Sequence, residues 1–175
     1  MPKAILTLSL FCFLSVQASA QLGVMKLVGS GTEDYQVGFG AFIKAGFPAF
    51  SSGDITLELG VNYFWLKDGD GSGTAMVPLK VGYMHMLNGS RKGFYVEPQV
   101  GYNLYGISSL PDENGYNVDY KYNGVVLAAG AGYVFLMRNT PINLNLRYET
   151  TIAKGGSNNL VSLGITRSFN IGKRD

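Results

Sequence analysis

The sequence predicts an all-β fold, an eight-stranded antiparallel up-and-down β-barrel whose strands cross a membrane. The first observation is a strict alternation of apolar residues, clearest in residues 93–106 (GFYVEPQVGYNLYG). A period of two is that of a β-strand and not of a helix. The segment is also long enough for a tilted strand across a bilayer, which needs about 9–11 residues. The second observation is composition: 24 glycines, 13% aromatic residues and 15% charged residues, against about 25% charged residues in soluble domains.

Seven further segments repeat this two-faced pattern and complete the count of eight. The predicted strands are Leu22–Val28, 35–46, 54–66, 75–87, 93–106, 123–136, 141–152 and 160–171. The first is the weakest, because only Leu22, Val24 and Val28 are apolar on its face, against Lys26. The joints between the strands are rich in Gly, Asn, Asp, Ser and Pro, which favour turns. The joint 108–120 is long and polar, and no segment after residue 20 has a helical pattern.

Residues 1–20 are predicted to be a secretory signal peptide. Lys3 supplies the positive charge, residues 5–16 the apolar core, and Ala18-Ser19-Ala20 the small-residue cleavage site, so that the mature domain is 21–175. The apolar core is too short for a membrane-spanning helix. Cys12 is the only cysteine and lies in this segment, so disulfides and thiolate metal sites are excluded after cleavage. Without Lys3 the basic residues number 13 against 12 acidic residues, a balance that gives no reason to expect nucleic acid as a partner.

Loop lengths predict the topology. Outer-membrane barrels have short periplasmic turns and longer outside loops. If both termini are periplasmic, the longest joint (108–120) is an outside loop and the shortest (138–140) is a periplasmic turn. Two features favour lipid on the outside of the barrel rather than a soluble, lipocalin-like barrel: aromatic residues end the apolar faces, and glycines crowd the opposite face. The predicted aromatic residues are Tyr35, Tyr63, Trp65, Tyr83, Phe94, Tyr133, Phe135 and Phe169.

The inward face predicts a charge network in the lumen. Its charged residues are Lys44, Glu58, Lys80, Glu97, Arg147 and Glu149, three of each sign. An eight-stranded barrel has room inside only for side chains, and unpaired charges in so small a space are costly. We therefore expect mutual pairing and a plugged lumen, although a solvated face with a chance balance of charge is the alternative. The larger side chains predicted to share the inward face are Phe42, Phe64, Met84, Tyr95 and Tyr105.

Two prolines conflict with regular pairing. Pro78 and Pro98 lie in the middle of predicted strands, where each removes a donor from the hydrogen-bond ladder. We expect bulges or locally open pairing at both positions.

Several segments together resemble a known family: VGFGAF, LELGVNYFW, PLKVGYMH, EPQVGYNLYG, AGAGYVF and the closing LGITRSF. With the signal peptide, they are similar to the OmpA/OmpX-type eight-stranded outer-membrane β-barrel domains of Gram-negative bacteria. The resemblance covers the whole mature chain and implies an outer-membrane location. It also implies insertion by the barrel assembly machinery, which reads a final strand ending in an aromatic residue. Here Phe169 is followed by further residues, a departure from that pattern.

Three classes of function follow for a membrane barrel: a structural or surface-interaction barrel, which the pattern favours, a narrow small-solute pore, and a lipid-modifying enzyme. A soluble lipocalin-like carrier is the remaining alternative. Outer-membrane lipid is the expected surrounding, the extracellular partner is unknown, and no cofactor is expected. We find no set of nucleophile, base and acid side chains around His85, the only histidine, that would predict catalysis. Asp68, Asp70, Ser72 and Gly73 spell the first half of a calcium loop, but Leu79 stands where the bidentate Glu belongs, which favours an ordinary hairpin loop.

Overall fold

A computed structural model describes residues 17–29, 32–50, 52–67, 73–89, 92–111, 117–138, 140–154 and 156–170. Its strands are β1 (Gln17–Val28), β2 (Gly38–Phe50), β3 (Gly53–Trp65), β4 (Gly73–Met86), β5 (Gly93–Pro111), β6 (Asn117–Lys121), β7 (Gly124–Met137), β8 (Thr140–Ala153) and β9 (Gly156–Asn170). The described residues form no helix. Accordingly, none of them belongs to a helix long and apolar enough to cross a membrane.

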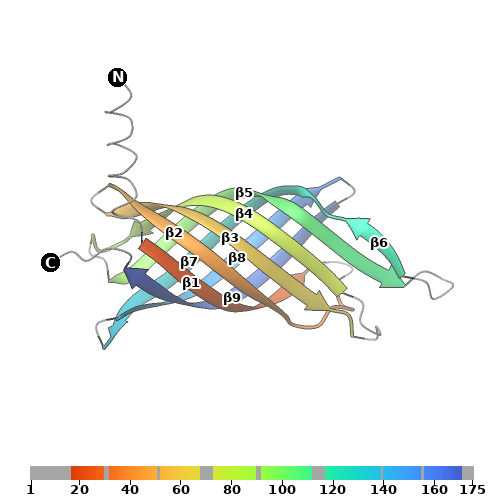
Figure 1. Cartoon of the computed structure of the whole chain (residues 1–175), viewed down its shortest axis with the longest axis horizontal. Coiled ribbons are helices and arrows are strands. Elements are labelled where there is room, and N and C mark those ends of the chain that lie inside the picture. The colour runs from red at the N-terminus through yellow and green to blue at the C-terminus, as the bar shows by residue number, and fades with distance from the viewer. Residues whose placement is uncertain are drawn as a thin grey trace, which may run out of the picture.

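Eight strand positions close into one barrel (Figure 1). Sequential strands pair antiparallel, β1 pairs with β9, and β4 pairs with β5 to complete the ring. β6 and β7 both pair with β5 and form a single strand position that is interrupted at Tyr122 and Asn123. The predicted eight-stranded antiparallel barrel is therefore confirmed.

The two ends of the barrel differ. Gln17 and Asn170 pair at one end, which we call the terminal end and which also carries the β2–β3, β4–β5 and β7–β8 turns. The opposite end carries the β5–β6 hairpin, which projects beyond the other strands in Figure 1, and we call it the hairpin end. The joints predicted to face outward all lie at the hairpin end.

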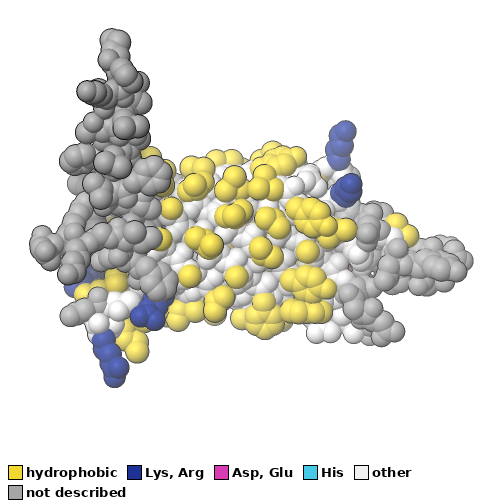
Figure 2. Space-filling model, in the orientation of Figure 1, with side chains coloured by type: hydrophobic (Ala, Val, Ile, Leu, Met, Phe, Trp, Pro, Cys, Tyr) yellow, Lys and Arg dark blue, Asp and Glu magenta, His cyan; other side chains and the backbone are white. Residues whose placement is uncertain are grey.

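Burial alternates along the strands, as a barrel with a packed interior requires. In β8, for example, Asn145 and Arg147 are buried while Leu144 and Leu146 are exposed. The exposed positions are apolar over the middle of the wall, and the Lys and Arg side chains visible in Figure 2 lie near its two ends. Aromatic contacts flank this apolar band, Phe39–Trp65 near the hairpin end and Phe94–Tyr133 near the terminal end. The direction of the faces is that of a membrane barrel.

The two prolines disturb pairing, as predicted. Between Val77 and Pro78 the register shifts, because Leu104 of β5 is an extra residue between the partners Asn103 and Tyr105. Pro98 pairs regularly with Ala129 of β7, but the β4–β5 ladder stops at Gly82–Gln99 and resumes at His85–Val96. Each proline lacks an N–H, and the ladder is bulged or open at that point.

The bulge makes one prediction about the inward face wrong. Tyr105 was expected in the lumen, but it is exposed on the outer wall, whereas Asn103 and Gly106 on either side of it are buried. The extra residue at Leu104 shifts the alternation by one position. Simple counting along β5 therefore fails beyond Asn103.

The joint 108–120 is also not a single loop. Ile107–Pro111 of β5 pairs with β6, so that much of this polar segment is a hairpin, and only residues 112–116 lie outside the described residues. Asn103 Nδ2 donates to the Tyr122 carbonyl at 2.6 Å, and the Gly106 carbonyl accepts from the Tyr122 N–H at 2.8 Å. These bonds satisfy the backbone where the β6–β7 position is interrupted.

Two boundary predictions change at the start of the chain. β1 begins at Gln17 and not at Leu22, so residues 17–20 of the predicted signal peptide pair with β2 and β9; cleavage after Ala20 stays a prediction.

Tyr35 was expected on the outer face, but its hydroxyl lies 3.0 Å from Ser108 Oγ and accepts from Thr74 Oγ1 at 3.3 Å, and both partners are buried. Tyr35 precedes β2, so the strand's alternation does not extend to it.

Candidate functional site

The six predicted lumen charges all have buried side chains inside the barrel. Lys44, Glu58 and Lys80 are direct cross-strand neighbours on β2, β3 and β4, because the registers pair Lys44 with Glu58 and Glu58 with Lys80. They therefore form one row on one wall. Glu97 lies on β5, and Arg147 and Glu149 share the inward face of β8 because they are two residues apart.

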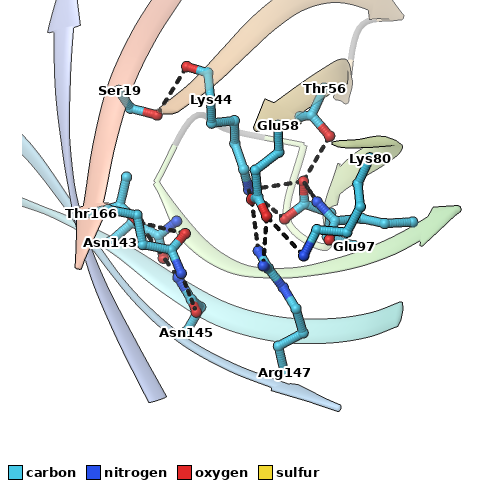
Figure 3. Close-up of polar contacts among 12 residues, drawn as sticks. Ser19, Lys44, Thr56, Glu58, Lys80, Glu97, Asn143, Asn145, Arg147 and Thr166 are labelled. Atoms are coloured by element: carbon cyan, nitrogen blue, oxygen red, sulfur yellow. Dashed lines mark hydrogen bonds and ion pairs between the residues drawn. The ribbon is translucent and has the colours of Figure 1, made fainter. Parts of the chain in front are cut away.

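Ion pairs across the lumen join this row to the other side chains (Figure 3). Arg147 donates to Glu58 through two parallel bonds, Nη1–Oε1 at 2.7 Å and Nη2–Oε2 at 2.9 Å. Lys44 Nζ lies 2.7 Å from Glu97 Oε2. Lys80 Nζ lies 2.5 Å from Glu149 Oε2. Each of these pairs links strands that are not neighbours in the ring.

Glu58 is the centre of the network. Besides Arg147, its carboxylate has Lys80 Nζ at 3.0 Å and Lys44 Nζ at 3.4 Å, so it contacts all three cations. Its side chain is fully buried, with 0% exposed. Every one of the six charges thus has an opposite charge in contact, which offsets the large cost of desolvation.

Neutral groups complete the site. Glu97 Oε1 accepts from Thr56 Oγ1 at 2.7 Å and from Gln99 Nε2 at 3.2 Å. The ring of Phe42 lies beneath two of the cations, 5.2 Å from Lys80 Nζ and 5.6 Å from the Arg147 guanidinium carbon. Phe42 in turn lies against Gly60, where a Cβ would be 2.2 Å from the ring. A side chain at position 60 would displace the ring that supports the cations.

A second polar cluster lies beside the network on β1, β8 and β9. Gln21 Nε2 donates to Asn145 Oδ1 at 3.3 Å, and Thr166 Oγ1 donates to Gln21 Oε1 at 3.3 Å. Next to it, the Tyr95 hydroxyl donates to Asn143 Oδ1 at 2.9 Å. These uncharged groups fill the part of the lumen where the six charges do not reach.

Apolar side chains pack in the lumen on both sides of the charges, and the sequence placed some of them there, namely Phe42, Phe64, Met84 and Tyr95. Toward the hairpin end, Met25, Leu27, Phe42, Phe64 and Leu160 form a buried cluster. Toward the terminal end, Met86, Tyr95 and Val134 form another. Their alternation with the exposed apolar face could have placed Met25 and Leu160 inside, but polar neighbours dominated the inward pattern.

Three buried atoms have no hydrogen-bond partner among the described residues: both amide atoms of Asn62 and the Oε1 atom of Gln99. Asn62 lies on β3, between Phe64 of the apolar cluster and the charged row at Glu58. In folded proteins such groups are usually satisfied, often by an ordered water. The level of Asn62, where two such atoms lie on one side chain, is therefore favourable to water.

The remaining candidate residues do not converge. His85 is half-buried, and its Nδ1 lies 3.5 Å from Ser52 Oγ. Asp68, Asp70 and Ser72 of the half calcium motif lie outside the described residues. Among the residues that the structure describes, no group of three or more His, Cys, Asp or Glu side chains could hold a metal ion.

Comparison with known proteins shows the fold. No protein-family profile and no curated protein sequence matches this chain. Among solved structures, it is similar to the N-terminal β-barrel domain of Pseudomonas aeruginosa OprF, with a TM-score of 0.62 and 12% identity over 87% of this chain and 97% of that one. It is similar to Ail, the attachment invasion locus protein of Yersinia pestis, with a TM-score of 0.58 and 12% identity over 89% and 98%. Neisserial surface protein A matches with a TM-score of 0.57 and 13% identity over 88% and 97%. The resemblance to OmpA/OmpX-type outer-membrane barrels is confirmed at the level of the fold.

Proposed function

We propose that this chain, which has the fold of OmpA/OmpX-type outer-membrane barrels, is a small outer-membrane protein with a structural or surface-interaction role and a plugged lumen. The single observation that carries the proposal is the network of six buried charges, each paired with an opposite charge. Paired charges hold opposite walls together and leave no free charge to attract a permeating ion.

The packing around the network supports a plug. An eight-stranded barrel has an interior just wide enough for side chains to fill. The apolar clusters at Phe64 and at Tyr95 lie on either side of the charges along the barrel axis. An ion crossing the lumen would have to pass both apolar layers and break the ion pairs between them.

The hairpin end supports a role at the cell surface. The β5–β6 hairpin extends the barrel on the side where longer loops are expected. The joint between β1 and β2 lies at this end and carries Glu33 and Asp34, which are both exposed, so the surface presented is partly acidic. One structural neighbour is described as an attachment invasion locus protein, and it has been crystallised with the heparin analogue sucrose octasulfate. For this chain the extracellular partner is unidentified.

Location and assembly belong to the same proposal. Residues 1–20 direct export, the barrel assembly machinery inserts the chain, and outer-membrane lipid surrounds the apolar wall. The apolar outward positions, such as Leu146 with 56% of its side chain exposed, support this environment. The proposal includes no catalytic role. A change in the mass of lipid A when the protein is expressed would reveal an enzyme and contradict the proposal.

The second candidate function is a narrow pore, and Asn62 favours it. Its two unpartnered amide atoms provide donors and acceptors for water just beyond the charged row. A water there would be the first step of a wet path through the apolar cluster at the hairpin end.

Single-channel recording separates the two functions. Purified protein in planar bilayers is expected to give no stable conductance, and Phe64→Ala, which removes a large side chain from the apolar layer, is expected to increase brief openings. Val118→Ala on β6 is the control, since Val118 lies outside the lumen on the hairpin. Steady ion-selective channels from the wild-type protein would overturn the plug and establish the pore.

A further inference from the structure

An apolar groove crosses the outer wall of the barrel over five strands, β3, β2, β1, β9 and β8. It has a volume of about 630 Å³, and its lining is Leu22, Gly23, Val24, Phe39, Gly40, Ala41, Val61, Tyr63, Leu144, Leu163, Gly164 and Ile165. In Figure 2, drawn from the same side as Figure 1, apolar side chains stand out from the wall, and white surface, which is backbone or other side chains, lies between them. The groove is thus a feature of the outward face and is separate from the charged lumen.

The strand registers explain its shape. One bank is the row Val61, Ala41, Leu22, Ile165 and Leu144, in which each residue pairs with the next. The other bank is the row Tyr63, Phe39, Val24 and Leu163. Between the banks, Gly40, Gly23 and Gly164 pair with one another. They are inward positions, so only backbone faces outward there and forms the floor.

The dimensions suit one extended hydrocarbon chain. Outward positions two residues apart are about 7 Å from each other along a strand, and four inter-strand steps measure about 19 Å. The groove is therefore long and only one chain wide. It begins beside Tyr63, near the end of β3 at Trp65, and finishes at Leu144, near the start of β8 at Thr140. It thus runs through the apolar band from the hairpin end toward the terminal end.

A positive charge lies next to the groove, beyond Val24 in the direction of the hairpin end. Lys26 is the next outward position on β1 after Leu22 and Val24, it is exposed, and its partner on β9 is Val161. A cation beside an apolar groove, on its side toward the hairpin end, complements a lipid whose phosphate lies at the membrane surface and whose chain extends into the membrane.

We propose that this groove holds an acyl chain of an anionic phospholipid, one whose headgroup carries no compensating positive charge, with the phosphate of that lipid at Lys26. The inference concerns the outer wall and adds a defined lipid site to the proposed membrane location. A second copy of the chain is the competing occupant. A two-fold dimer would bring the same patch against itself, and two slots facing each other leave a gap, whereas a hydrocarbon chain fills one.

The single tryptophan reports on the groove. Trp65 contacts Phe39 and Tyr63, which both line it, at ring-centroid distances of 5.9 and 4.8 Å. In phosphatidylcholine vesicles, doxyl-labelled phosphatidylglycerol should quench Trp65 fluorescence at a several-fold lower mole fraction than doxyl-labelled phosphatidylcholine. Ala41→Phe fills the middle of the groove and should abolish this difference, and the smaller Ala41→Leu should reduce it. Ala131→Phe is the matched control, since Ala131 is exposed on β7 and is not among the residues that line the groove.

Each variant tests one part of the site. Lys26→Gln should bring the two lipids to equal quenching while leaving chain contact in place. Equal quenching by both lipids in the wild-type protein, or an Ala41→Phe variant that behaves like Ala131→Phe, would overturn the site. Disulfide cross-linking between copies of an Ala41→Cys variant would show that a second copy occupies the groove and would overturn the lipid site. None of these readouts depends on whether the lumen conducts, so the lipid site and the plugged lumen can fail separately.

Discussion

Arg147 on β8 and Glu58 on β3 form a bidentate ion pair between strands on opposite sides of the barrel. The ring order places β4, β5 and β7 between them in one direction and β2, β1 and β9 in the other. A guanidinium matches a carboxylate in two parallel bonds, so this pair fixes both the distance and the orientation of the two walls. It crosses the middle of the barrel and is the natural place to test the network.

Removing Arg147 should destabilise the barrel. Arg147→Met leaves Glu58 with Lys44 and Lys80 alone, and breaking a buried pair typically costs about 3–5 kcal/mol. We expect the free energy of unfolding to fall well below that of Lys154→Met, whose side chain is exposed beyond β8. Denaturant titration in lipid vesicles, read by heat-modifiable gel mobility, measures both. Equal stability of the two variants would contradict a dry, paired lumen.

Removing Glu58 should cost more than removing Arg147. Glu58 contacts three cations, whereas Arg147 contacts one carboxylate. Glu58→Met therefore leaves Lys44, Lys80 and Arg147 together with only Glu97 and Glu149. The same titration should rank Glu58→Met as the least stable, and the double variant Glu58→Met, Arg147→Met should be less destabilised than the two single effects added together. Simple additivity would show that the two side chains do not interact.

The network illustrates how far the sequence could predict the site. Alternation alone placed all six lumen charges on inward positions, Lys44, Glu58 and Lys80 among them. The partners across the lumen could not be predicted, because they depend on how far the strands are staggered around the ring. Glu58 meets Arg147, 89 residues away, and no local pattern encodes that distance.

The errors arose where the period of two is broken. Leu104 is an extra residue in β5, so Tyr105 faces outward, and Pro78 opposite was the only local sign of the irregularity. β6 was read as loop because its residues are polar, yet its pairing to Ile107–Pro111 uses backbone groups that any side chains allow. Of the apolar cluster at the hairpin end, the sequence placed Phe42 and Phe64 inside but not Met25 and Leu160, because polar residues dominated the inward pattern.

Gly60 should tolerate no side chain. A Cβ there would lie 2.2 Å from the ring of Phe42, whereas a Cβ at Gly130, also on an inward position, would come no closer than 3.5 Å to any atom. Overpacking of this kind costs about 1–3 kcal/mol, so Gly60→Ala should lower the unfolding free energy and Gly130→Ala should not. Combining Gly60→Ala with Phe42→Leu should restore part of the loss. If Gly60→Ala were as stable as Gly130→Ala, Phe42 would not be fixed beneath the cations.

The direction of the two faces can be tested by site-directed spin labels on β8. A label at position 146, where Leu146 is exposed, should be relaxed by oxygen dissolved in the lipid. A label at position 145, where Asn145 is buried in the lumen, should be shielded from both oxygen and a water-soluble nickel complex. Leu146→Arg should also cost about 2–4 kcal/mol if the position is near the bilayer midplane. Relaxation of the label at 146 by the nickel complex would contradict the membrane assignment.

Orientation can be tested by cysteine labelling of intact cells. With Cys12 in the predicted signal peptide, a single cysteine introduced elsewhere is the only target in the mature chain. Val118→Cys on the β5–β6 hairpin should react with a membrane-impermeant maleimide, whereas Arg138→Cys in the β7–β8 turn should react only after permeabilisation. The reverse pattern would invert the topology.

The interruption at Tyr122 and Asn123 also makes the hairpin exchangeable. Asn103 and the Gly106 carbonyl close the ladder there, but Ile107 and Ser108 still pair with β4. Among the described residues, only 109–111 and 117–119 pair solely with each other. These residues can be replaced or lengthened without opening a barrel seam. The sequence of this outer part of the hairpin can therefore change without changing the barrel wall. In the wall, the paired charges of the lumen limit which substitutions are tolerated.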